Sequence, residues 1–180
     1  MKLYGENIYL RFLELKDAEG MVTLNIKNKE FFQQYVTTRH EGFYTIEGQE
    51  ERILESIKSR EDDQKYKFGI FLKENDKLIG NIALTEVLRG PLQSCFIGYY
   101  LDKDCNGKGY MTEAVKLITK YAFEELKLHR IEAGVMPHNA GSMKVLEKAG
   151  YIKEGIARKN VMINGEWRDH QVLAIICEND

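Results

Sequence analysis

The sequence has little of what marks secreted, membrane-spanning or metal-binding proteins. Its three cysteines, Cys95, Cys105 and Cys177, are odd in number and far apart, which predicts neither a disulfide framework nor a zinc site. No run of about 18 apolar residues is present, which argues against a transmembrane helix. The first residues lack the apolar segment of a signal peptide. We therefore expect a cytoplasmic protein that does not associate with membranes.

An excess of positive charge is also missing. The 26 basic and 28 acidic residues give a formal net charge of −2, whereas nucleic-acid-binding domains usually carry a basic excess. Nothing in the composition indicates a nucleic-acid partner. His40, His129 and His170 show no metal-ligand spacing, so we predict no metal.

No repeat, low-complexity segment or linker divides the chain, so we predict a single domain over residues 1–180. Apolar periodicities predict the order β-α-α-β-β-β-α-β-α-β-β, a mixed α/β (α+β) fold. The predicted strands cover 7–12, 65–72, 78–87, 92–101, 130–136, 151–162 and 167–177, and the predicted helices 17–26, 45–63, 111–122 and 139–149.

Three further expectations concern how these elements begin, pair and connect. The helix between strands 92–101 and 130–136 is typical of a right-handed crossover, which makes that pair of strands parallel. Asp17 is a good N-cap for the first helix. The aromatic-rich residues 30–44 form a loop or short helix that either lines a pocket or packs beneath the core.

The stretch Asn106-Gly107-Lys108-Gly109-Tyr110-Met111-Thr112 carries the strongest signal in the chain. Two glycines at a strand-to-helix junction allow a sharp turn with exposed N–H groups. The N-terminus of the following helix adds unpaired donors and the positive end of a dipole. This combination predicts a seat for a phosphate group.

Two well-known phosphate loops do not fit this stretch. A Walker A loop needs Lys followed by Ser or Thr after its last glycine, and here Lys108 lies between the glycines. A Rossmann fingerprint needs a third glycine where this chain has Thr112. Both designs are therefore disfavoured.

A third design does fit, because the stretch resembles the acetyl-CoA loop of the GNAT N-acetyltransferases, roughly Gln/Arg-x-x-Gly-x-Gly/Ala. Asn106 stands for the Gln/Arg and Met111 for the small last residue. Segments 130–133, 136–139 and 146–151 are similar to the ribosomal-protein N-terminal acetyltransferase branch (RimJ/RimL type). The resemblance covers nearly the whole chain. It implies the acyl-CoA N-acyltransferase fold with a parallel strand pair splayed around CoA, acetyl-CoA as cosubstrate, and a homodimer.

The resemblance also assigns roles to residues. Backbone N–H groups from Gly107 to Thr112 would hold the pyrophosphate, and Asn139 would contact the pantetheine arm. The Ser142 hydroxyl would lie near the sulfur and protonate or solvate the leaving thiolate. Without the resemblance, Asn139 is a helix cap with Ser142 exposed in the first turn. The predicted cofactor-binding residues are Tyr100, Leu101, Asn106, Gly107, Lys108, Gly109, Tyr110, Met111, Thr112, Asn139 and Ser142.

The general base is the least defined group. Glu86 shares a strand face with Ile82 and Leu84, so its carboxylate could have a raised pKa and accept a proton, unless the strand ends there and Glu86 is solvated. An α-amine, with a pKa near about 8, needs less help from a base than a lysine amine near about 10.4. The lack of an obvious strong base therefore favours an α-amine.

These observations predict an acyltransferase that moves acetyl directly to a primary amine, the N-terminal α-amine of a protein such as a ribosomal protein. Two alternatives stay open. The acceptor could be a small-molecule amine, such as a polyamine, an antibiotic or a metabolite, or the chain could be a non-catalytic acetyl-CoA sensor. We expect residues 31–44 and 89–93 to form the acceptor wall.

Overall fold

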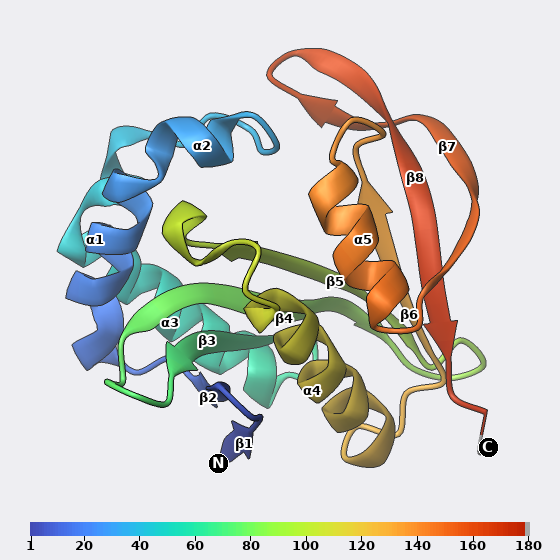
Figure 1. Ribbon diagram of the computed structural model, residues 1–180, viewed down its shortest axis with the longest axis horizontal. Helices are drawn as coiled ribbons and strands as arrows, with labels where there is room; N and C mark the ends of the chain where they lie inside the picture. The colour runs from blue at the N-terminus through green and yellow to red at the C-terminus, as the bar shows by residue number, and fades with distance from the viewer. Residues whose placement is uncertain (179–180) are drawn as a thin grey trace.

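Figure 1 shows the computed structural model of the chain, which describes residues 1–178. Within them one sheet has the strand order β1-β2-β3-β4-β5-β6-β8-β7. The strands are β1 (Lys2–Tyr4), β2 (Ile8–Phe12), β3 (Tyr66–Leu72), β4 (Leu78–Leu88), β5 (Ser94–Leu101), β6 (Arg130–Val135), β7 (Ile152–Ile163) and β8 (Glu166–Ile176). The α-helices are α1 (Ala18–Lys27), α2 (Lys29–Gln33), α3 (Ile46–Glu61), α4 (Tyr110–Glu124) and α5 (Ala140–Lys148).

The predicted mixed α/β fold is confirmed, and so is the parallel pairing of β5 with β6. β1 was not predicted, whereas α2 agrees with the short-helix alternative for residues 30–44. Both are short, with three and five residues, so neither has room for an apolar period. The second helix is shorter than predicted, since α3 ends at Glu61.

Helices cover both faces of the sheet and bury its apolar side chains. α4 is amphipathic, and its buried residues recur every three or four positions along one stripe: Met111, Ala114, Val115, Ile118 and Ala122. They join the core formed by β2 to β6. On the other face, α1 and α3 bury Met21, Leu24 and Ile53 against Phe71 of β3. The sheet is thus the middle layer between two helical layers (Figure 1).

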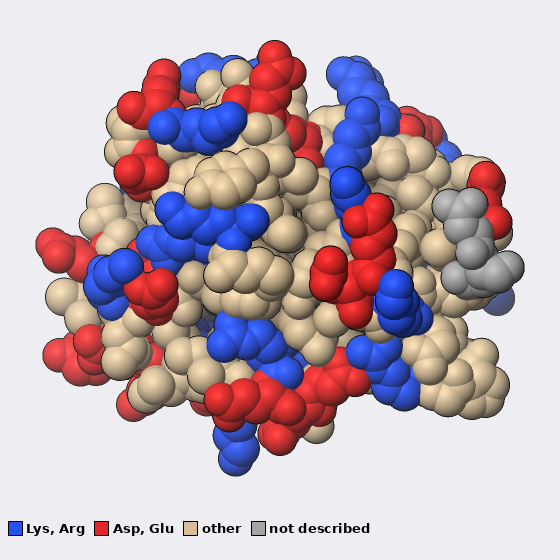
Figure 2. All heavy atoms as spheres, turned by 90° about the horizontal axis from the view of Figure 1, so that it is seen from below, with Lys and Arg blue, Asp and Glu red and all other residues tan. Residues whose placement is uncertain are grey.

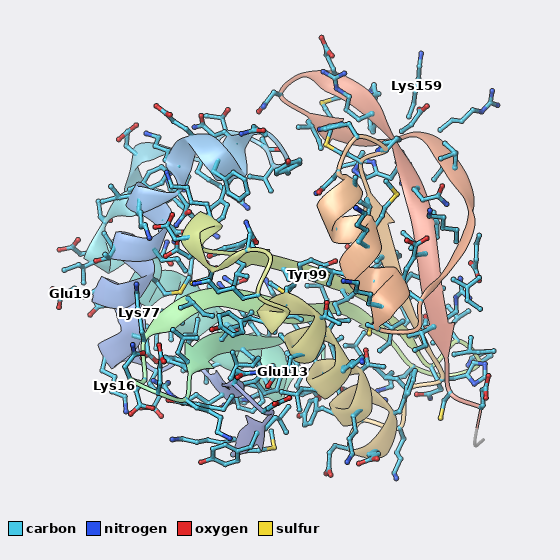
Figure 3. All side chains as sticks on the ribbon, viewed as in Figure 1. Lys16, Glu19, Lys77, Tyr99, Glu113 and Lys159 are labelled. Atoms are coloured by element: carbon cyan, nitrogen blue, oxygen red, sulfur yellow. The ribbon has the colours of Figure 1, made fainter. Side chains whose placement is uncertain are left out.

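Two polar anchors set the ends of helices that flank the site. Glu113, in the first turn of α4, accepts the N–H groups of Asn7 at 2.9 Å and Ile8 at 3.2 Å, which ties α4 to the turn between β1 and β2 (Figure 3). Asp17 does not cap α1 with its side chain, contrary to the prediction. Its carboxylate instead binds the Arg11 guanidinium through two bonds of 2.7 Å.

The parallel strands β5 and β6 separate after three residue pairs, Ser94–Arg130, Cys95–Ile131 and Phe96–Glu132. β4 stays paired with β5 up to Leu101, and β8 stays paired with β6 up to Val135. Because β5 stays with β4 and β6 stays with β8, β5 and β6 diverge from each other. The edge of β5 from Ile97 to Leu101 therefore has no strand partner on the β6 side within the described residues, so its backbone groups are free for another partner.

Two surface features complete the description. No helix in the 1–178 portion has the length and apolar character required to traverse a bilayer. Seen from below, Lys and Arg side chains are interspersed with Asp and Glu side chains (Figure 2). That face therefore shows no broad area of one charge.

Candidate active site between the diverging strands

The loop after β5 is anchored by Lys27 and Asn28, at the C-terminal end of α1. Asp102 is only 2 % exposed, and its carboxylate binds the Lys27 ammonium at 2.7 Å. Lys27 also contacts Asp104 at 2.6 Å, and the Asn28 side chain accepts the Lys103 N–H at 2.9 Å. These contacts hold the start of the glycine loop in place, and the two carboxylates raise the pKa of Lys27.

The two glycines give this loop its shape. Gly107 and Gly109 have φ values of 76° and 81°, a conformation that residues with a Cβ rarely adopt. A Cβ at either position would meet nothing within 4 Å, so the requirement is conformational, and open space lies in front of the loop. Gly109 is the N-cap of α4 and offers no side-chain cap. The first N–H groups of α4 therefore lack intrahelical partners, and the loop fits a phosphate group.

Met111 departs from the small residue expected at the end of this loop. Its side chain is 6 % exposed and packs in the core beneath α4. Met111 also lines the cavity described below, so this larger residue is accommodated between the core and the site.

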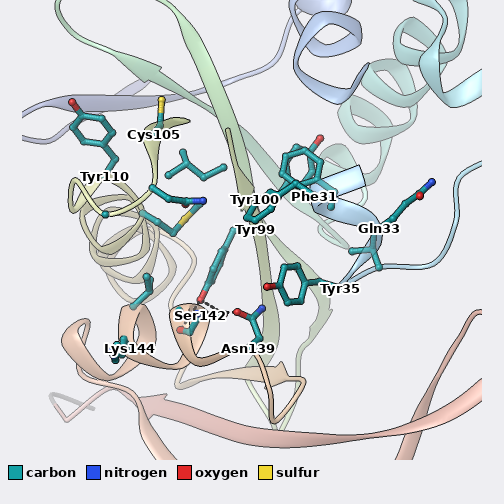
Figure 4. A pocket seen from close by; sticks show the side chains of 18 of the residues that line it. Phe31, Gln33, Tyr35, Tyr99, Tyr100, Cys105, Tyr110, Asn139, Ser142 and Lys144 are labelled. Atoms are coloured by element: carbon teal, nitrogen blue, oxygen red, sulfur yellow. Dashed lines mark hydrogen bonds between the residues drawn. The ribbon is translucent and has the colours of Figure 1, made fainter. Parts of the chain in front are cut away.

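A cavity of about 630 Å³ lies between this loop, β5, α5 and the segment that contains α2 (Figure 4). It is lined by every predicted cofactor-binding residue except Lys108, which is exposed. The assigned roles of these residues stay predictions. Phe31, Phe32, Tyr35 and Tyr44 also line the cavity, so residues 30–44 follow the pocket alternative.

Tyr99, Ser142 and Asn139 meet on one side of the cavity (Figure 4). The Tyr99 hydroxyl lies 2.8 Å from Ser142 Oγ, where either oxygen can donate. Asn139 Oδ1 accepts the Ser142 N–H at 3.2 Å and caps α5. Burial raises the pKa of Tyr99 to about 12, so its hydroxyl keeps its proton at neutral pH. The site therefore presents two adjacent hydroxyl groups.

Tyr99 was not among the predicted site residues, although the sequence carried a signal for it. Side chains alternate between the faces of a strand, so Tyr99 and Tyr100 must point to opposite faces of β5. Tyr99 joins the core beside α4 and α5, whereas Tyr100 packs with the cluster of α1 and α3.

The structure does not bring Glu86 to this cavity. β4 contains a bulge between Thr85 and Leu88, and Glu86 has a φ of 51° and an exposed side chain. The bulge interrupts the alternation that placed Glu86 with Ile82 and Leu84. Its predicted role as a base stays untested, with no support from its position.

Residues 89–93 do not line the cavity either, contrary to the predicted acceptor wall. They precede β5 and lie at the opposite end of that strand from the glycine loop. Arg89 instead binds Asp63, with its Nε 2.6 Å from the carboxylate.

The aromatic segment bridges the two sides of the cavity at two points. The Tyr35 ring stacks on His138, with centroids 5.8 Å apart. The Thr38 N–H donates to Asn164 Oδ1 at 2.8 Å. Asn164 lies in the turn that joins β7 to β8. The cavity is therefore covered on the α2 side by a segment that contacts both halves of the sheet.

Comparison with known proteins agrees with this geometry. Residues 7–152 match the acetyltransferase (GNAT) domain family. The chain is 58 % identical to the probable N-acetyltransferase YjcK of Bacillus subtilis (strain 168), over 99 % of this chain and 98 % of that one. It is 29 % identical to the [ribosomal protein uS5]-alanine N-acetyltransferase of Escherichia coli (strain K12), over 97 % and 90 %.

Solved structures show the same likeness. The ribosomal-protein-S5-alanine acetyltransferase of Vibrio fischeri superposes with a TM-score of 0.93 at 30 % identity, covering 99 % of this chain and 98 % of the other. Mycobacterium smegmatis RimJ in complex with CoA-disulfide gives a TM-score of 0.89 at 25 % identity, covering 95 % and 82 %. The chain belongs to the GNAT acetyltransferase family, in its RimJ/RimL-type branch, and is an N-acetyltransferase.

Proposed function

We propose that this protein transfers acetyl from acetyl-CoA directly to the N-terminal α-amine of a protein, such as a ribosomal protein. One domain, residues 1–180, would carry the reaction. The observation that supports it best is the opening between β5 and β6, which joins the glycine loop to the covered aromatic side of the cavity. Relatives named ribosomal-protein-alanine N-acetyltransferases support the choice of acceptor.

The donor side follows from the free backbone groups. The N–H groups of Gly107 to Thr112 can hold a pyrophosphate, and Lys144 and Lys148 of α5 line the same cavity. The unpaired edge of β5 near Tyr100 and Leu101 can bond the amide groups of a pantetheine arm, as a further strand would. The bound thioester would supply the acetyl group.

The hydroxyl pair is placed to handle the leaving group. Tyr99 can donate to Ser142 Oγ at 2.8 Å, which orients the Ser142 proton toward the cavity. This pair can then protonate or solvate a departing thiolate. Asn139 positions Ser142 by accepting its backbone N–H.

The charge of the cavity favours an α-amine. Among the residues of the 1–178 range that line it, none is Asp or Glu, while four are Lys or Arg. Nearby positive charge disfavours an ammonium ion and lowers its pKa. An α-amine, with a pKa near about 8, then becomes neutral without a strong base, whereas a lysine amine starts near about 10.4.

The test compares three classes of acceptor in a free-thiol release assay. One is peptides with a free N-terminus, the second is the same peptides with a blocked N-terminus and an internal lysine, and the third is polyamines and other small amines. We expect turnover with the first class and mass spectrometry to place the acetyl group on the α-amine. Turnover of small amines alone contradicts the protein acceptor, and acetyl-CoA binding without thiol release indicates a sensor.

A variant tests the assigned acid in the same assay. Ser142→Ala should lower turnover by about ten- to a thousandfold, while the Kd for CoA measured by calorimetry stays nearly unchanged. Unchanged turnover would remove Ser142 from the mechanism. The homodimer stays a prediction that analytical ultracentrifugation can test.

A further inference from the structure

Positive charge on the α2 side of the cavity is only partly matched by carboxylates, since Lys29 pairs with Glu41 at 3.7 Å. Arg39 lines the cavity there and has no ion-pair partner within residues 1–178. Its guanidinium lies 5.1 Å from the centroid of the Phe43 ring, and the Arg52 guanidinium lies 4.8 Å from the same centroid. Phe43 is 9 % exposed, so one buried ring carries two guanidinium groups.

Lys67 adds a third cation to this group. Burial, together with the charges of Lys65, Arg52 and Arg39, lowers the pKa of Lys67 to about 8. We call Arg39, Arg52 and Lys67 the cationic corner. Of the three, Arg39 lines the cavity. Neighbouring like charges disfavour one another, so Arg39 gains from an anion that binds in the cavity.

Two buried amides beside the corner also lack partners. The Nδ2 groups of Asn25 and Asn81 make no hydrogen bond of good geometry within residues 1–178, although both side chains lie near the Tyr100 hydroxyl and act to lower its pKa. These residues are only 1 % and 5 % exposed. A buried donor left without a partner is costly. Asn25 lines the cavity, so its amide is placed to donate to a bound group.

The Tyr100 hydroxyl connects the amides to the corner. Burial raises the pKa of Tyr100 to about 12, while Asn25, Arg39, Arg52 and Asn81 act on it in the opposite direction. The hydroxyl therefore keeps its proton at neutral pH and adds another donor. The groups assembled here offer N–H and O–H donors and positive charge, which is complementary to a carboxylate.

The corner lies on the acceptor side of β5. Tyr100 packs with the cluster of α1 and α3, whereas Tyr99 and Ser142 lie on the α5 side. The opening between β5 and β6 connects the two sides. An acceptor that enters from the α2 side can therefore pass the corner while its amine points toward the thioester.

We propose that Arg39 of the cationic corner and the amide of Asn25, which both line the cavity, form a carboxylate subsite that selects N-terminal peptides with an acidic side chain in their first few residues. This inference rests on the proposed function, since it concerns the peptide acceptor of the same site. The acidic side chain binds at the corner and the α-amine extends to the reaction centre.

The experiment uses three peptides that share the first residue Ala and differ at positions two and three, which are Glu-Glu, Gln-Gln or Arg-Arg. We expect the Glu-Glu peptide to have the highest kcat/KM and the Arg-Arg peptide the lowest. Arg39→Gln should raise KM for the Glu-Glu peptide about threefold, the scale of a partly exposed ion pair. The ratio of kcat/KM between the Glu-Glu and Gln-Gln peptides should fall by about the same factor.

Two further variants make the result specific. Arg39→Glu should invert the preference and improve the Arg-Arg peptide over the Glu-Glu peptide. Lys120→Gln removes one positive charge from an α4 side chain that is 69 % exposed, and it should leave all three values of KM unchanged. Because Arg39 is exposed, its substitutions test the subsite without disturbing the core.

The outcomes separate this inference from the proposed function. Equal kcat/KM for the Glu-Glu and Gln-Gln peptides overturns the carboxylate subsite and leaves the α-amine acceptor intact. Absence of turnover with every peptide overturns the proposed function. If a free amino dicarboxylate is acetylated faster than any peptide, the carboxylate subsite is supported. The bound carboxylate then belongs to a small molecule, and the peptide acceptor is overturned.

Discussion

The hydroxyl pair of Tyr99 and Ser142 gives the sharpest test of the mechanism. Tyr99→Phe removes one oxygen and leaves the ring, which packs against the core. The Tyr99 hydroxyl lies 2.8 Å from Ser142 Oγ and 3.3 Å from the Ser142 carbonyl oxygen. The substitution therefore removes one hydrogen-bonding group at the α5 side of the cavity.

The size of the effect distinguishes two roles for Tyr99. If its hydroxyl only orients Ser142, the loss is that of one hydrogen bond, about 0.5–1.5 kcal/mol, or about two- to twelvefold in kcat. If the pair delivers the proton to the leaving thiolate, the loss is that of a general acid, at least about a hundredfold. We expect the larger value, because Tyr99 is the stronger acid of the two hydroxyls.

The assay follows thiol release at saturating acetyl-CoA for Tyr99→Phe, Ser142→Ala and the double variant. Groups that act as a unit are not additive, so the double variant should be no slower than the slower single one. Tyr121→Phe is the matched control, because Tyr121 is 7 % exposed and packs against Phe68 in the core. It should retain full turnover.

The pH profile provides a second readout. Burial raises the pKa of Tyr99 to about 12, so the hydroxyl stays protonated as the acceptor amine loses its proton at lower pH. The wild-type kcat should therefore rise with pH and then stay level up to about pH 10. Fully additive losses in the double variant, or a Tyr99→Phe enzyme with wild-type kcat, would refute the hydroxyl pair.

Three further predictions concern parts that hold the site in place. Gly109→Ala forces a Cβ into a φ of 81° and should lower stability by about 1–2 kcal/mol and weaken CoA binding, measured by calorimetry. Asn139→Ala removes the cap of α5 and should lower the free energy of unfolding in urea by about 1 kcal/mol. Asp17→Asn leaves the half-buried Arg11 charge unpaired and should destabilise the protein at pH 7. Arg11 is among the groups that hold the pKa of Asp17 below its usual value. The stabilisation by the Arg11–Asp17 pair is therefore fully present above about pH 4 and is lost as the pH falls and Asp17 is protonated. The variant should therefore lose less stability upon acidification.

The parts of the site that could be predicted from the sequence are those built from neighbouring residues. The glycine loop and α4 are contiguous, so the backbone freedom of Gly107 and Gly109 and the apolar stripe of α4 are visible in the sequence. Asn139 and Ser142 are three residues apart at a helix start, so their shared turn is visible as well. Local spacing was sufficient for these groups.

The parts that could not be predicted depend on strand register and on one irregularity. The bulge in β4 moves Glu86 out of the alternation, and a non-glycine residue at a φ of 51° gives no sequence signal. The cationic corner combines Arg39 of a loop, Arg52 of α3 and Lys67 of β3. This grouping joins residues far apart in the chain, so composition and periodicity do not contain it.

The divergence of β5 from β6 also has a mechanical consequence. The halves β1–β5 and β6–β8 share only three backbone pairs within the described residues, helped by the Tyr35–His138 stack and the Thr38–Asn164 bond. The backbone connection between the two halves is therefore sparse, and the shared core of side chains supplies the rest of their contact. If acetyl-CoA binds along Ile97–Leu101 as proposed, its backbone-like hydrogen bonds would add to this edge, and binding would stabilise the folded protein.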